Sequence, residues 1–199
     1  MKSSKVIKLA VFASGGGSNA LEIFEHFKNS ENVNVALCAT NNANAGVIQH
    51  AKSHKIDVVV FKNEDFIDGN LVLDKLKDFQ IDFIVLAGFL RKIPEMLTES
   101  FKDRIINIHP ALLPMYGGKG MYGKNVHRAV KENNESFSGP TIHLVNNKFD
   151  DGAILAQFET KIEETDTPDD IARKVLVLEH QYFAKVIESY IKESQINKF

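Results

Sequence analysis

Cysteine is nearly absent from this chain of 199 residues, as are long apolar runs and any excess of one charge. The single cysteine, Cys38, excludes an intramolecular disulfide, and its apolar surroundings predict a small buried hydrophobic residue. With 24 basic and 26 acidic residues, the net charge of −2 gives no support for a nucleic-acid partner. No apolar stretch is long enough to cross a bilayer, and the first five residues lack the features of a signal peptide. We therefore expect a cytoplasmic protein that binds neither nucleic acid nor a membrane.

The first half of the chain alternates short apolar runs with helical patterns. Such alternation predicts right-handed crossovers and a mostly parallel, twisted sheet with helices on both faces. The near-continuous apolar run at 83–88 is typical of a central strand that is covered on both sides. Strands are expected at 6–13, 33–40, 58–61, 83–88 and 105–109, and helices at 18–28, 44–54 and 65–79.

After Pro110 the pattern changes to a glycine-rich loop at 115–123, followed by a helix near 125–132. Two strands, at 141–147 and 154–160, are expected to pair antiparallel, and a last helix begins at Pro168 and runs to about residue 192. Asp166 or Thr167 is expected to cap this helix. No linker or internal repeat divides the sequence, which predicts one α/β domain over residues 1–199.

A glycine turn stands where the first strand hands over to a helix. Glycines 15–17 permit close ligand approach, and with Ser18, Asn19 and the free amides of the helix they predict an anion site. A plain strand-to-helix turn is the alternative. A dinucleotide site is disfavoured because Ala20 replaces the third glycine and residues 40–42 include no acidic side chain for a ribose. A single phosphate fits better.

Asn107 and His109 lie one residue apart on a predicted strand, so their side chains share a face. Pro110 ends the strand, at the sheet edge where open α/β sheets bind ligands. An amide donor beside an imidazole suits a developing oxyanion, although a lone histidine after a strand is more often structural. The seven histidines are scattered, and His50 and His54 lack the glutamate of a metalloprotease motif, so we expect no metal.

Three further carboxylates, Asp150, Asp151 and Glu179, occupy positions that bear on the candidate site. Asp151 is interpreted as a turn residue, whereas Asp150 is a candidate partner for His109 that would raise the pKa of the imidazole. Glu179 falls inside an apolar stripe of the last helix and therefore needs a partner or a ligand. The neighbouring His180 is interpreted as a satisfied core histidine.

Five segments in order give the chain a resemblance to a known family. They resemble the phosphoribosylglycinamide formyltransferases, a branch of the folate-dependent formyltransferase family, and the match covers essentially the whole chain. The most specific is Asn-Ile-His-Pro-Ala-Leu-Leu-Pro. The segments are Ser-Gly-Gly-Gly-Ser-Asn (14–19), Leu-Ala-Gly-Phe-Leu-Arg (86–91), Asn-Ile-His-Pro-Ala-Leu-Leu-Pro (107–114), Gly-Pro-Thr-Ile-His-Leu-Val (139–145) and Asp-Asp-Gly-Ala-Ile-Leu-Ala-Gln (150–157).

The resemblance implies a Rossmann-like formyltransferase fold and transfer of a formyl group from 10-formyltetrahydrofolate to the amine of glycinamide ribonucleotide, a step of purine (IMP) biosynthesis. The enzyme would act without metal, as a monomer or homodimer. The implied catalytic residues are Asn107, His109 and Asp150; the implied ribonucleotide contacts are Gly17, Ser18, Asn19 and Glu179. The implied folate contacts are Leu90, Arg91, Lys92, Ile93, Asn107, Asn146, Asn147, Lys148, Phe149 and Asp150.

Departures and rival activities also follow from the resemblance. The loop at 116–124 is longer than in bacterial members, Met115 stands where a lysine is common, and no arginine aligns for the folate tail. Formyltetrahydrofolate deformylases carry an additional N-terminal domain, and methionyl-tRNA formyltransferases carry a C-terminal RNA-binding domain. Neither is expected here. A nucleotide-dependent oxidoreductase and a non-catalytic folate sensor are the remaining alternatives.

Overall fold

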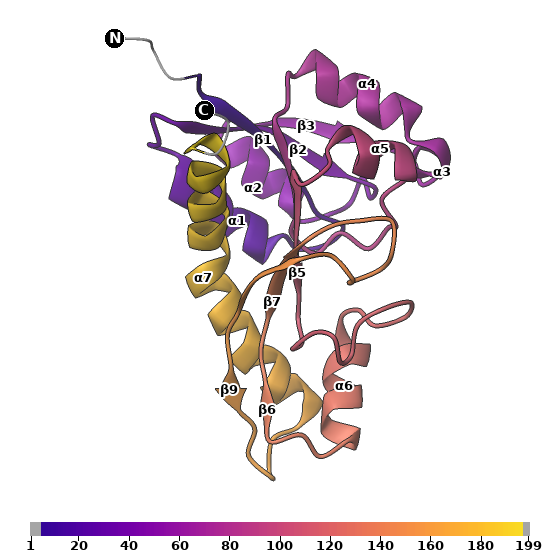
Figure 1. Cartoon of the computed structure of the whole chain (residues 1–199), viewed down its shortest axis with the longest axis vertical. Helices are drawn as coiled ribbons and strands as arrows, with labels where there is room; N and C mark the ends of the chain where they lie inside the picture. Colours follow the sequence, from indigo (N-terminus) through magenta and orange to yellow (C-terminus); the bar gives the residue numbers. More distant parts are fainter. Residues whose placement is uncertain (1–4, 197–199) are drawn as a thin grey trace. The chain divides into compact units, whose positions relative to one another are not determined.

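The computed structural model describes residues 5–196, whose contacts cluster into two compact units that divide after Ile106. Each unit has its own strands and helices (Figure 1). In the described part of the chain no helix combines the length and apolar character needed to cross a membrane.

The first unit is a parallel sheet with flanking helices. Its strands stand in the order β3-β2-β1-β4, and the pairs β1–β2, β1–β4 and β2–β3 are parallel. Helices α1 and α2 pack against each other and against β2. The elements are β1 (Ile7–Phe12), α1 (Ser18–Phe27), β2 (Val33–Thr40), α2 (Val47–Ser53), β3 (Asp57–Val60), α3 (Asp65–Asp68), α4 (Asn70–Asp78), β4 (Phe83–Leu86) and α5 (Glu95–Ser100).

Apolar side chains explain why these segments form a sheet. The two central strands are almost completely buried, as the near-continuous apolar runs predict. Phe12 of β1 makes edge-to-face contacts with Phe66 and Phe89, whose ring centroids lie 6.4 and 5.3 Å away. Cys38 of β2 is fully buried, which confirms its prediction as a core residue, and burial raises the pKa of its thiol to about 12.

The second unit contains β5 from Asn107 onward, followed in the sheet order by β7 and β8, together with a small sheet of β6 and β9. The pairs β7–β8 and β6–β9 are antiparallel, and α6 packs against α7. A cluster of Val130, Ile162, Ile171 and Val175 forms an apolar core, against which Tyr116 packs. The elements are β5 (Ile105–His109), α6 (Lys124–Glu132), β6 (Phe137–Ser138), β7 (Thr141–Leu144), β8 (Ile154–Gln157), β9 (Thr160–Lys161) and α7 (Pro168–Ile196).

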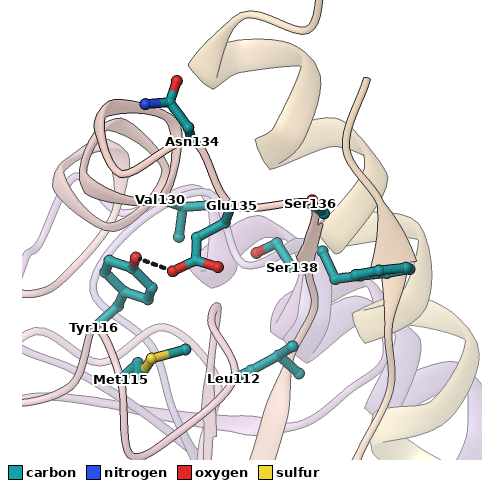
Figure 2. Close-up of a pocket in the computed structure, with 9 residues that line it drawn as sticks. Leu112, Met115, Tyr116, Val130, Asn134, Glu135, Ser136 and Ser138 are labelled. Atoms are coloured by element: carbon teal, nitrogen blue, oxygen red, sulfur yellow. Dashed lines mark hydrogen bonds between the residues drawn. The ribbon is translucent and has the colours of Figure 1, made fainter. Parts of the chain in front are cut away.

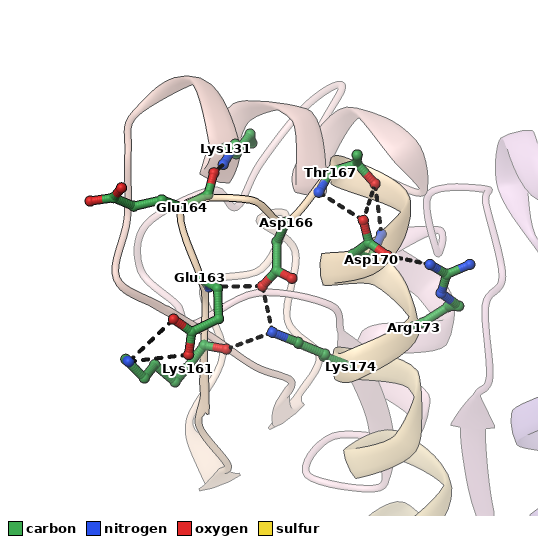
Figure 3. A network of polar contacts seen from close by, with 9 residues as sticks. All are labelled: Lys131, Lys161, Glu163, Glu164, Asp166, Thr167, Asp170, Arg173 and Lys174. Atoms are coloured by element: carbon green, nitrogen blue, oxygen red, sulfur yellow. Dashed lines mark hydrogen bonds and ion pairs between the residues drawn. The ribbon is translucent and has the colours of Figure 1, made fainter.

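A capping box fixes the start of α7 (Figure 3). The hydroxyl oxygen of Thr167 accepts a hydrogen bond from the amide of Asp170 at 3.2 Å, and Asp170 Oδ2 accepts one from the amide of Thr167 at 2.9 Å. The hydroxyl and amide of Thr167 lower the pKa of Asp170 to about 2. Asp166 instead pairs with Lys174 at 2.5 Å, so Thr167 is the cap among the two candidates.

The predicted fold class, a mostly parallel sheet with an antiparallel pair and flanking helices, is confirmed. The prediction of one continuous helix over residues 65–79 is wrong, because Gly69 adopts a φ of +81° and separates α3 from α4. The last helix also continues past residue 192, to Ile196. The extent of a single domain over residues 1–199 stays a prediction.

Candidate active site

Strand β5 carries Asn107 and His109 on one face. Ile106 and Ile108, the alternate residues of the strand, are buried, while Asn107 is half-buried. His109 is only 3% exposed. Its Nε2 donates a hydrogen bond to the carbonyl oxygen of Tyr116 at 2.7 Å, because a carbonyl can only accept. The imidazole is therefore held with its Nε2 protonated.

Asp150 lies in the turn between β7 and β8 and approaches the imidazole from the other side. Its Oδ1 is 3.6 Å from His109 Nδ1, and its Oδ2 accepts a hydrogen bond from the amide of Gly118 at 2.8 Å. Gly117 permits this approach, since a Cβ there would lie 2.6 Å from Leu113 Cδ2 and 3.2 Å from Asp150 Cβ. Backbone groups of residues 116–118 thus touch both ionisable side chains.

A fourth residue, His143 of β7, joins the other three. Its Nδ1 lies 2.7 Å from the carbonyl oxygen of Leu144 and must donate to it, so in the neutral ring Nε2 is the acceptor. That nitrogen accepts a hydrogen bond from Asn107 Nδ2 at 3.0 Å and lies 3.7 Å from Asp150 Oδ1. We call Asn107, His109, His143 and Asp150 the His109 cluster.

His143 was not singled out from the sequence. It is 1% exposed and lies in a β-strand among apolar neighbours, where a buried polar group needs partners. That burial was the available signal, but the partners themselves are 36 and 7 residues away in the chain, and their proximity follows only from the fold.

Burial dominates the ionisation of His109. Desolvation lowers the pKa of its imidazole below 6.5, outweighing Asp150 and the Tyr116 carbonyl, which both act to raise it. The sequence-based expectation of a raised pKa is therefore wrong in its net direction, although Asp150 acts in the expected sense. Burial would raise the pKa of Asp150 itself, but His143, the Gly118 amide and His109 together hold it below 3.8. The free protein at neutral pH thus combines a neutral imidazole with a carboxylate.

The predicted phosphate site lies in the first unit, at the start of α1. Gly17 has a φ of +79°, and a Cβ there would lie 2.6 Å from Val47 Cβ, so the turn requires glycine. Ser18 is exposed and Asn19 is half-buried. No side chain caps α1, a helix of 10 residues, and the positive end of its dipole favours an anion there.

The predicted folate contacts belong to two segments in different units. In the first unit Leu90, Arg91 and Lys92 are exposed, and Ile93 is buried. In the second unit the loop Asn146, Asn147, Lys148 and Phe149 is exposed and leads to Asp150, with the amide of Lys148 donating to Asn146 Oδ1 at 2.9 Å.

Glu179, in the middle of α7, is 7% exposed and has an interaction partner, as expected for a carboxylate on an apolar stripe. Among residues 5–196, no three or more His, Cys, Asp or Glu side chains gather in an arrangement suited to a metal ion.

The chain matches a family model described as formyl transferase over residues 7–187. It is 45% identical over 192 residues to phosphoribosylglycinamide formyltransferase, chloroplastic, of Arabidopsis thaliana, with 94% of this chain and 66% of the relative covered. A 32% identical relative, phosphoribosylglycinamide formyltransferase of Bacillus subtilis, is matched over 92% of this chain and 94% of its own length. The chain thus spans just under two thirds of the Arabidopsis relative.

The chain is also similar to solved structures of phosphoribosylglycinamide formyltransferases. The crystal structure of phosphoribosylglycinamide formyltransferase from Bacillus halodurans matches with a TM-score of 0.85 and 32% identity, over 94% of this chain and 96% of that one. The corresponding enzyme from Brucella melitensis matches with a TM-score of 0.84 and 29% identity, over 94% and 96% of the two chains.

Proposed function

The chain belongs to the formyl transferase family, and we propose that it transfers the formyl group of 10-formyltetrahydrofolate to the amine of glycinamide ribonucleotide. The relatives that carry the name phosphoribosylglycinamide formyltransferase support this substrate pair. The observation that carries the proposal is the His109 cluster, in which three successive contacts join four side chains: Asn107 to His143 at 3.0 Å, His143 to Asp150 at 3.7 Å and Asp150 to His109 at 3.6 Å.

The reaction begins when the uncharged amine attacks the formyl carbon. A carbon–nitrogen bond forms, and the carbonyl oxygen becomes an oxyanion. Asn107 donates one amide hydrogen to His143 and keeps the second for this oxygen. When the neutral His109 ring takes up a proton at Nδ1, its positive charge supports the oxyanion, and Asp150 stabilises this imidazolium.

The tetrahedral intermediate then collapses. The bond from the formyl carbon to the folate nitrogen breaks, and the proton lost by the attacking amine passes to that nitrogen, directly or through water. His109 is placed to shuttle this proton because its lowered pKa leaves the ring neutral and able to accept. Formylated ribonucleotide and tetrahydrofolate are the products, so the step needs no other reactant.

The two substrates would bind to different sets of residues. The amides of Gly17, Ser18 and Asn19 hold the phosphate at the start of α1, and Glu179 contacts the ribonucleotide. The folate is held by Leu90, Arg91, Lys92, Ile93, Asn107 and the residues Asn146, Asn147, Lys148, Phe149 and Asp150. Holding both reactants in line supplies part of the rate gain.

The cytoplasmic location, the monomer or homodimer and the absence of a nucleic-acid partner stay predictions. The plant relatives are named as chloroplastic.

The deciding experiment supplies purified protein with 10-formyltetrahydrofolate, with and without glycinamide ribonucleotide. We expect tetrahydrofolate to appear only when both substrates are present. Release of formate without the ribonucleotide would make the protein a hydrolase, and binding of folate without turnover would make it a sensor. Either result would reject the transferase.

A further inference from the structure

A cavity of about 310 Å³ lies within the second unit, away from the residues assigned to the formyl transfer. It is lined by Tyr116 but by no member of the His109 cluster (Figure 2). Its volume falls at the lower end of the range of ligand pockets, which corresponds to a molecule of about one ring.

The walls of this cavity are mainly apolar. Leu112, Met115, Val130 and Phe137 contribute to its lining. Met115 is 54% exposed and Phe137 is 51% exposed, although both are large apolar side chains that water disfavours. A ligand with an apolar body would cover part of this surface and so gain free energy on binding.

The charge of the cavity lining is negative. Glu135 is the one charged residue in its lining. The hydroxyl of Tyr116 donates to Glu135 Oε1 at 2.6 Å, which orients the carboxylate, and Figure 2 shows both of its oxygens facing the space between Tyr116 and Ser138. A carboxylate oriented in this way attracts a cation and repels an anion.

Ser138 supplies an independent sign that something polar belongs here. The residue is 1% exposed, and its hydroxyl oxygen has no hydrogen-bond partner among the described residues. In Figure 2 the hydroxyl points toward the side where the Glu135 carboxylate lies. A buried hydroxyl without a partner costs free energy, and a donor from a ligand would remove that cost.

We propose that this cavity is a second ligand site, which takes a small organic ammonium with an apolar or aromatic body. The ammonium carries three donors, enough for Glu135 and the Ser138 hydroxyl together, and the body packs on Leu112, Met115 and Val130. A neutral alcohol of the same shape leaves the carboxylate without a countercharge, and a carboxylate ligand is repelled by it.

The test reads binding rather than turnover, so its outcome is separate from that of the formyl-transfer assay. Benzylamine is titrated into the full chain at neutral pH and followed by NMR, with benzyl alcohol and benzoate as controls of equal shape. We expect saturable shifts at the methyl groups of Leu112, Met115 and Val130 with the amine, and weaker or no shifts with the controls. Equal binding of all three probes, or no shift with millimolar amine, would overturn the proposal.

Three variants, one of them a control, test which residues of the cavity recognise the amine. Glu135→Gln keeps an oxygen for the Tyr116 hydroxyl but removes the charge, and we expect it to weaken amine binding roughly tenfold. Glu132→Gln on α6 makes the same change outside the lining and should leave binding unchanged. Ser138→Ala should weaken binding about threefold while leaving the protein at least as stable, since it removes a buried hydroxyl without a partner. Wild-type affinity in Glu135→Gln would reject the site.

Discussion

The glycine turn at residues 14–19 and the His109 cluster hold polar groups in opposite ways. The turn depends on backbone shape, because Gly17 adopts a φ of +79° and Val47 occupies the space that a Cβ at residue 17 would need. The cluster depends on side chains whose protons are fixed by their neighbours, with His143 oriented by Leu144 and Asn107 oriented by His143. A substitution in the turn should therefore lower the stability of the protein, whereas a substitution in the cluster should lower its turnover.

The largest expected effect is loss of turnover when the cluster loses an ionisable group. His109→Ala and Asp150→Asn should each lower kcat by about 10²–10⁴, the usual range for a general acid or base, while substrate binding changes much less. Steady-state kinetics and direct binding of the ribonucleotide separate the two effects. Near-normal kcat in either variant would show that the cluster is not the chemical centre.

The turn should fail in a different way. Gly17→Ala should destabilise the protein by about 2–4 kcal/mol, because alanine is strained at this φ and its Cβ collides with Val47. Urea unfolding measures the change. Gly16→Ala is the matched control, since no atom lies within 4 Å of its added Cβ, and a similar loss there would contradict the role of shape.

His143 tests whether orientation alone matters within the cluster. His143→Leu removes the acceptor of the Asn107 amide, and we expect kcat to fall about tenfold, equivalent to about 1.4 kcal/mol, with little change in KM. His143→Gln offers a replacement acceptor and should recover part of the loss. If the leucine variant keeps full kcat, the amide of Asn107 is oriented by something else.

The smallest effect is on the pH dependence of stability, to which His109 and His54 contribute with opposite signs. Burial lowers the pKa of His109, so the unfolded chain binds more protons, and the protein loses stability as pH falls below about 6.5. The His50 carbonyl and the Glu25 carboxylate raise the pKa of His54 in the first unit, so the contribution of His54 to stability is complete below 6.5 and is lost as pH rises through the pKa of the folded state.

Unfolding at a series of pH values in two variants distinguishes these contributions. Compared with the native protein, His109→Asn should lose less stability on acidification. His54→Asn should gain less, and its effect should be the weaker because salt and solvent screen a pair that includes the half-exposed Glu25. Identical pH profiles in His109→Asn and the native protein would contradict the lowered pKa.

Local sequence patterns predicted most of the fold, and the elements that they failed to predict show the limit of such patterns. The alternation of apolar runs gave the parallel strands, because burial on both faces leaves a direct mark on composition. The break at Gly69 was missed because the apolar spacing continues across it, and strands β6 and β9 are only two residues long each. Short-range spacing placed Asn107 and His109 on one face.

The remainder of the candidate site depends on contacts that no local pattern contains. The net direction of the pKa of His109 depends on how deeply the fold buries the ring, which outweighs the charge of Asp150. The partners of His143 come from two other segments, and the bond from Glu135 to Tyr116 joins residues 19 positions apart. The acidic turn offered Asp150 as a candidate and the resemblance implied its catalytic role, but its contact with the Gly118 amide required the fold.

The segment from Tyr116 to Gly118 contacts His109 through a carbonyl and Asp150 through an amide. Neither group belongs to a side chain, so a systematic alanine scan would score both positions without touching the bonds themselves. A backbone ester in place of the Gly118 amide deletes the donor while leaving the aspartate intact, whereas Gly118→Pro would also distort the loop, because proline fixes φ near −65° and Gly118 has a φ of +97°. Surveys of mutational tolerance therefore underrate this stretch, whose chemistry is carried by the main chain.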